Sequence, residues 1–156
     1  MKTRELSRQY ARLQTLISKT QSITSGDIEA QSHWAKYLCV LSAGFLENAL
    51  REVYRHYCAN CSNAHVARFT GKALERIQNP KTATFLEVAE SFLPKWKTDL
   101  EAFLDAEGRK EAINSIMANR HLIAHGKDSN ISMVRVKEYL QRSAEVVEFI
   151  ENQCGI

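Results

Sequence analysis

The segment from about Asp27 to Asn60 constrains the fold most, because its apolar residues follow helical spacing on two sides along its whole length. One apolar stripe consists of Trp34, Tyr37, Leu38, Leu41 and Phe45, and the other of Cys39, Ala43, Leu46, Leu50, Val53 and Tyr57. A helix that is apolar on two sides is buried on two sides. We therefore predict a long central helix, which faces a second surface beyond its own domain, such as that of a partner subunit.

Residues that break helices are scarce in the rest of the chain. Only two prolines, Pro80 and Pro94, and six glycines are present, whereas a β-rich domain of this size needs more turn residues. A chain of 156 residues with 44% hydrophobic content is long enough for one domain with a core of its own. The sequence therefore predicts a single all-α domain that spans residues 1–156.

Four main helices are expected in this domain. The first has one apolar face, the second is the central helix, the third runs from about Arg109 to His125, and the last is opened by Ser129 or Ser132. Shorter helical segments are expected between the second and third main helices, at residues 63–79, 84–92 and 96–104. The predicted architecture is an up-down four-helix bundle with short helical insertions.

The net charge of +3 is too small to predict nucleic-acid binding by itself. The first helix is nevertheless basic, which suits either phosphate contacts or a solvated face: Lys2, Arg4, Arg8, Arg12 and Lys19 accompany a single acid, Glu5. No apolar run approaches the roughly 18 residues of a membrane span, and the N-terminus has no signal-peptide core. We therefore expect a cytoplasmic protein with no membrane partner.

Cys58 and Cys61 have CxxC spacing, and His56 and His65 lie nearby in the sequence. A zinc site needs four ligands of suitable geometry, and the chain has no second CxxC. The redox interpretation needs a βαβ context, which the helical pattern does not offer. We expect free cysteines and no bound metal or cofactor.

Arg120 falls near the centre of the apolar stripe that Ile113, Ile116 and Met117 define on the third main helix. A guanidinium on an apolar face is costly unless it is paired or lines a cavity. Glu47 and Glu52 of the central helix are candidate partners. Arg120 is therefore either a buried structural ion pair or a functional group, and both interpretations can hold together.

His125 ends the same helix, directly before Gly126, where the negative end of the helix dipole favours an imidazolium. A histidine in this place suits proton transfer, although many only cap the last carbonyls. Arg120 and His125 are five residues apart and diverge by about 140° on an ideal helix. One helix cannot easily close both around one phosphate, but two copies that meet across a two-fold axis can.

The segment Asn119–Gly126 resembles the R-x4-6-H motif of HEPN domains, in which a polar residue, here His121, follows the arginine. The long central helix and the last helix opened by a serine agree with this family, and the similarity is greatest to its RiboL-PSP branch. The resemblance implies a homodimeric, metal-independent endoribonuclease that acts as a toxin or in defence against foreign elements, with a possible antitoxin or defence-system partner. Related toxins that a nucleotidyltransferase modifies carry a tyrosine where this chain has Lys127, which argues against that regulation.

The resemblance also implies roles for single residues. His125 serves as acid or base, Arg120 stabilises the phosphate charge, and His121 assists in positioning. The supporting residues are Glu47, which would orient Arg120, and Asn119; the expected RNA-binding residues are Lys127 and Arg51. Two alternatives stay open, a non-catalytic HEPN module that binds nucleotide or RNA or scaffolds a partner, and a purely structural helical dimer.

Overall fold

A computed structural model describes the whole chain, residues 1–156, as seven α-helices without a β-strand. The prediction of an all-α fold is therefore confirmed. None of the helices combines the length and the apolar character that a membrane span requires. The helices are α1 (Arg4–Ile23), α2 (Ile28–Cys61), α3 (Ala64–Leu74), α4 (Thr82–Phe92), α5 (Pro94–Asp105), α6 (Arg109–Ala124) and α7 (Met133–Gln153).

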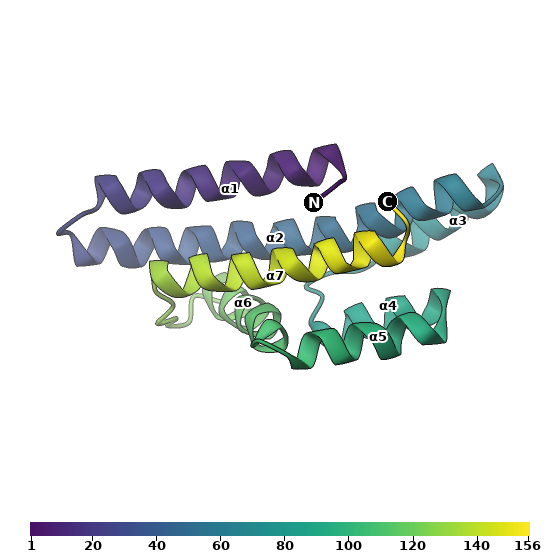
Figure 1. Cartoon of the computed structure of the whole chain (residues 1–156). Coiled ribbons are helices and arrows are strands. Elements are labelled where there is room, and N and C mark those ends of the chain that lie inside the picture. Colours follow the sequence, from purple (N-terminus) through teal and green to yellow (C-terminus); the bar gives the residue numbers. More distant parts are fainter.

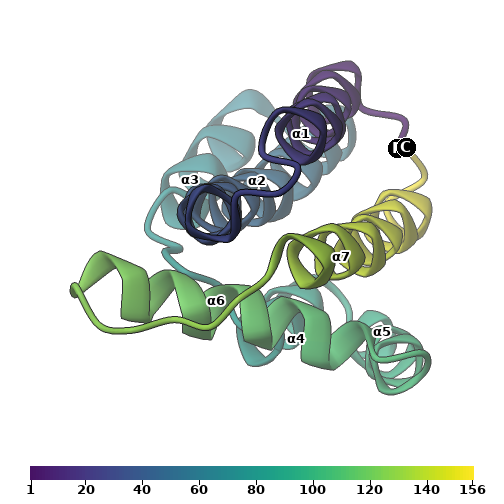
Figure 2. The same ribbon diagram turned by 90° about the vertical axis from the view of Figure 1, so that its left-hand side faces the viewer.

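The central position of α2 follows from its contacts, because it packs against α1, α3, α6 and α7. Helices α1, α2 and α7 run alongside one another (Figure 1). Helix α6 instead runs across α2 and α7, and the loop that leaves its C-terminal end returns to α7 (Figure 2). The two chain termini lie side by side, where the N-terminal ammonium is 2.5 Å from the Glu148 carboxylate.

The two apolar stripes of α2 differ in how far they are buried. In one stripe Cys39, Leu46 and Leu50 are buried at 0 to 1% exposure, and Tyr57 at its C-terminal end is half-buried. The other stripe is covered only in part, because the Trp34 side chain stays 39% exposed and that of Tyr37 52% exposed. The predicted burial is thus found along one side as far as Val53, and the N-terminal half of the other side is open.

The linker between α3 and α4 explains why the predicted helix 63–79 ends early, at Leu74. Arg51 of α2 donates a hydrogen bond to the Ile77 carbonyl, and Glu47 accepts one from the Asn79 amide at 2.8 Å. Asn79 also has a positive φ of 49°, which a helix does not allow. These contacts hold the non-helical linker against α2.

Helix α4 begins two residues earlier than its apolar pattern predicts. The Asn114 side chain of α6 accepts hydrogen bonds from the amide and the hydroxyl of Thr82, both at 3.1 Å. Because a first-turn amide has no partner within its own helix, this contact stabilises an early start. The position of α4 is therefore fixed by α6.

Candidate active site

Helix α6 is anchored below the motif by its apolar face. Ile113, Ile116 and Met117 are 0 to 2% exposed, and the Cys39 thiol of α2 donates a weak hydrogen bond to the Ile116 carbonyl at 3.6 Å. Burial raises the pKa of the Cys39 thiol to about 12, and a hydrogen bond from the backbone of Arg120 opposes this rise. The thiol is therefore neutral at physiological pH, and it connects α2 to the backbone of the motif.

The C-terminal end of α6 is closed by a Schellman motif. Gly126, at a φ of 64°, donates to the Ile123 carbonyl at 3.2 Å, and Lys127 donates to the Leu122 carbonyl at 2.9 Å. The helix therefore ends at Ala124, and His125 is its C-cap. The predicted cap at Gly126 is confirmed, and it holds the His125 backbone at a fixed place.

We expect Gly126→Ala to lower the free energy of unfolding by about 1 to 2 kcal/mol, because an alanine at this positive φ is strained. Urea unfolding followed by circular dichroism measures the change. Gly71→Ala is the matched control, since Gly71 lies within α3 and an added Cβ meets only ordinary contact there. The control should be neutral or stabilising by up to about 1 kcal/mol. Equal losses in both variants would contradict this account of the cap.

His121 and His125 lie next to each other, one helical turn apart on the solvent side of α6. Their ring centroids are 4.4 Å apart and the rings are inclined by 57°. Both side chains are exposed. Two imidazoles in this arrangement can reach a single phosphodiester group, so His121 is as well placed for proton transfer as His125.

Arg120 is half-buried and forms no ion pair, which corrects the expected pairing with Glu47 or Glu52. Each glutamate instead bonds an arginine of its own helix, Glu47 to Arg51 and Glu52 to Arg55, both at 2.8 Å. Side chains three or four residues apart on one helix are neighbours, so both carboxylates pair within α2 and not with Arg120. The charge of Arg120 is left free for an external anion.

Arg51 and Lys127, the two expected RNA-binding residues, differ in their surroundings. Arg51 is bound by Glu47 and by the Ile77 carbonyl, so its guanidinium positions the α3–α4 linker, and we leave it out of the RNA-binding groups. Lys127 is exposed, forms no ion pair and lies two residues beyond His125. Of the two, only Lys127 adds a free positive charge beside the histidines.

Asn119 fixes the loop that follows the motif. Its amide nitrogen donates to the Ser115 carbonyl and its amide oxygen accepts from the Ser129 hydroxyl, both at 2.8 Å. Ser129 is buried at 5% exposure, whereas Ser132 is the residue that opens α7, accepting from the Arg135 amide at 3.3 Å. Sequence reasoning did not foresee the role of Ser129, because it depends on a contact across the loop.

The CxxC pair lies at the C-terminal end of α2, away from α6. Cys58 is buried and Cys61 is exposed, and both are free thiols. Burial raises the pKa of Cys58, and a hydrogen bond with Thr70 partly offsets this effect. No group of three or more His, Cys, Asp or Glu side chains is arranged to hold a metal ion.

A comparison with known protein families assigns the chain to one of them. It matches the RiboL-PSP-HEPN family over residues 4–155, which is almost its whole length. No curated protein and no solved structure matches it. HEPN domains as a class include ribonucleases and nucleotide-binding modules. The chain therefore belongs to the RiboL-PSP-HEPN family.

Proposed function

We propose that this protein is an endoribonuclease that cleaves RNA without a metal ion, through a composite Arg120 and histidine site at a homodimer interface. In this role it acts as a toxin or in defence against foreign genetic elements. The observation that carries the proposal is the exposed His121–His125 pair, with ring centroids 4.4 Å apart, on the same helix as the unpaired guanidinium of Arg120. These groups supply a base, an acid and a cation on two turns of one helix.

The chemistry needs only these groups, because RNA carries its own nucleophile. One imidazole accepts the proton of the 2′-hydroxyl, and the 2′-oxygen attacks the adjacent phosphorus while the bond from phosphorus to the 5′-oxygen breaks. An imidazolium donates a proton to the leaving 5′-oxygen. The products are a 2′,3′-cyclic phosphate and a 5′-hydroxyl. Arg120 stabilises the negative charge that develops on the phosphorane.

A dimer is favoured because Arg120 and the histidines project in different directions from α6. Arg120 and His125 diverge by about 140° on one helix. If two copies of α6 approach across a two-fold axis, Arg120 of one protomer can lie opposite the histidine pair of the other. The site would then be complete only in the dimer.

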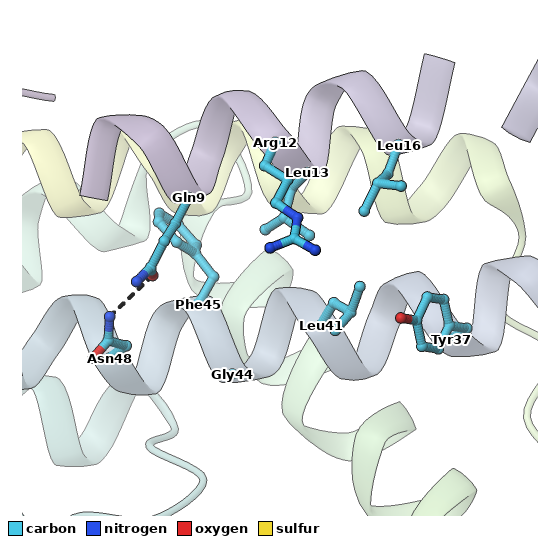
Figure 3. Close-up of a pocket in the computed structure, with 9 residues that line it drawn as sticks. All are labelled: Gln9, Arg12, Leu13, Leu16, Tyr37, Leu41, Gly44, Phe45 and Asn48. Atoms are coloured by element: carbon cyan, nitrogen blue, oxygen red, sulfur yellow. Dashed lines mark hydrogen bonds between the residues drawn. The ribbon is translucent and has the colours of Figure 1, made fainter. Parts of the chain in front are cut away.

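The open side of α2 is the surface that we assign to the partner subunit. Trp34, Tyr37 and Val40 are 39%, 52% and 36% exposed, an unusual concentration of large apolar side chains. Beside them lies a groove of about 430 Å³ between α1 and α2, into which the Arg12 side chain extends (Figure 3). Gly44 on the groove floor has nothing within 4 Å of an added Cβ, so no contact within the chain requires a glycine there.

A glycine in the interior of a helix costs about 1 kcal/mol relative to alanine. Since Gly44 has no role within one chain, we infer that it allows a second backbone to approach α2 closely. Two α2 helices that cross at Gly44 would cover Tyr37 and Val40. For the composite site to form, the same crossing must also bring the α6 helices of the two protomers toward each other.

We expect wild-type protein to sediment as a dimer at micromolar concentration and Tyr37→Glu to sediment as a monomer, because an interface that covers this side of α2 would have to desolvate the new carboxylate. Phe69→Glu is the matched control, since Phe69 is an exposed aromatic residue on α3, away from the open side of α2. Analytical ultracentrifugation measures both. A monomeric wild type, or a dimer that survives Tyr37→Glu, would contradict the assignment.

The proposed activity is tested with a labelled oligoribonucleotide in EDTA. Cleavage should proceed, and the products should carry 2′,3′-cyclic phosphate and 5′-hydroxyl ends. DNA of the same sequence should survive, because it lacks the 2′-hydroxyl. Cleavage that stops on chelation would overturn the proposal, and RNA binding without cleavage would favour a non-catalytic module.

A further inference from the structure

A second groove lies between α3 and α4, at the end of the molecule opposite the α6–α7 loop (Figure 1). It encloses about 470 Å³. Most of its lining is apolar, contributed chiefly by Phe69, Ala73, Leu74, Ile77, Val88 and Phe92. Neither the motif on α6 nor the open side of α2 contributes a residue to it.

Helix α3 has an apolar side that the chain leaves uncovered. Its only substantial packing partner is α2. The Phe69 side chain is 76% exposed and that of Val66 48% exposed, and both lie on the helical stripe that continues to Ala73. Phe69 lines the groove, and Val66 extends the exposed apolar stripe beyond it. An exposed apolar patch of this kind is typical of a binding surface.

The floor of the groove is rigid on the α4 side. The Phe92 ring stacks on Tyr54, with centroids 4.7 Å apart, and also contacts Tyr57 and Trp96. Tyr54 is fully buried. A partner that enters the groove therefore meets aromatic side chains that are already held in place, which lowers the entropic cost of binding.

The charges along the two rims differ in sign. Arg68 and Lys72 of α3, and Arg76 in the turn directly after it, follow one another at intervals of four residues. All three are exposed, and none forms an ion pair. The α4 side presents Glu87, which is also exposed. A ligand that fits both rims is acidic along the side that faces α3.

We propose that the α3–α4 groove binds an amphipathic helix of a partner protein, with apolar residues in the groove and acidic residues against Arg68, Lys72 and Arg76. An amphipathic helix in an apolar groove is a common mode of peptide recognition. A nucleic acid fits less well, because the exposed carboxylate of Glu87 on the α4 side of the groove would repel phosphate. The occupant and the RNA use separate surfaces, so this inference does not depend on the proposed ribonuclease activity.

The test uses a synthetic helical peptide of about 14 residues, long enough to span α3, with leucines on one face and glutamates on the flank that meets α3. A peptide of the same composition in scrambled order is the control. Fluorescence anisotropy with the full-length protein measures both dissociation constants. The designed peptide should bind at least about tenfold more tightly than the scrambled one. Equal affinities, or no binding, would overturn the proposal.

Variants locate the binding site. Phe69→Ser should weaken binding of the designed peptide about tenfold, because it removes an apolar anchor without touching the core. The triple variant Arg68→Glu, Lys72→Glu, Arg76→Glu should do the same. The matched triple variant Lys2→Glu, Lys19→Glu, Lys137→Glu changes the net charge equally, on exposed residues elsewhere, and should bind as the wild type does. An equal loss in both triple variants would show non-specific attraction and reject the site.

Two further measurements separate peptide binding in this groove from RNA binding there and from the proposed ribonuclease activity. A single-stranded RNA of about 12 nucleotides that displaces the peptide, and loses affinity in the α3 triple variant, would show a nucleic-acid surface instead. Phe69→Ser should cleave RNA at the wild-type rate if the protein is a ribonuclease. Peptide binding and RNA cleavage can therefore fail independently.

Discussion

His125→Ala is expected to lower the rate of RNA cleavage by about 10² to 10⁴, the usual contribution of general acid–base catalysis. Stability should change little, because the His125 side chain is exposed and the cap of α6 is formed by backbone groups of Gly126 and Lys127. Single-turnover cleavage in EDTA and thermal unfolding measure the two effects. Preserved cleavage in this variant would reject the mechanism.

Two further histidine variants sharpen this result. His121→Ala should also slow cleavage, because its ring lies beside that of His125 and can share the same phosphate. His65→Ala is the control, since His65 is exposed on α3 and has no place in the site. A loss in His65→Ala as large as that in His125→Ala would show that the effect is not specific to the motif.

Arg120→Ala is expected to abolish cleavage while the fold is retained. If Glu47 paired with Arg120, as the sequence allows, this variant would also lose stability, because a carboxylate would be left without its partner. In the structure Glu47 bonds Arg51 and the Asn79 amide, so removal of Arg120 leaves no carboxylate unpaired. The melting temperature should therefore fall only slightly. Circular dichroism measures the melting temperature, and single-turnover cleavage measures the activity. An unfolded variant would support a structural role for Arg120.

Arg120→Lys provides a matched control that keeps the positive charge. It should recover only part of the activity, because an ammonium does not reproduce the planar fork of a guanidinium on phosphate oxygens. Mixing Arg120→Ala and His125→Ala subunits then tests the composite site. A heterodimer has one site with both groups intact if each site takes them from different subunits, and recovered cleavage would show this arrangement. No recovery would mean that a site takes both groups from one subunit or needs all four groups.

The sequence alone determined the helical class and most helix ends, because these depend on interactions within a few residues. Asp27 caps α2 by accepting from the Ala30 amide at 2.9 Å, as its position before the long stripe predicts. Gly126 ends α6 because only a residue tolerant of positive φ fits there. The same local signals placed His125 at an exposed helix end.

Only the tertiary structure decided which polar groups pair. Glu47 and Arg51 are 26 or more residues from the linker that they hold at Ile77 and Asn79, and Asn114 is 32 residues from Thr82. Helical periodicity specifies a face and not a partner, so the sequence left Glu47 and Glu52 as candidate partners of Arg120, and neither pairs with it. The free guanidinium of Arg120 and the groove between α3 and α4 both follow from how the helices pack, because packing fixes which side chains meet and which remain exposed.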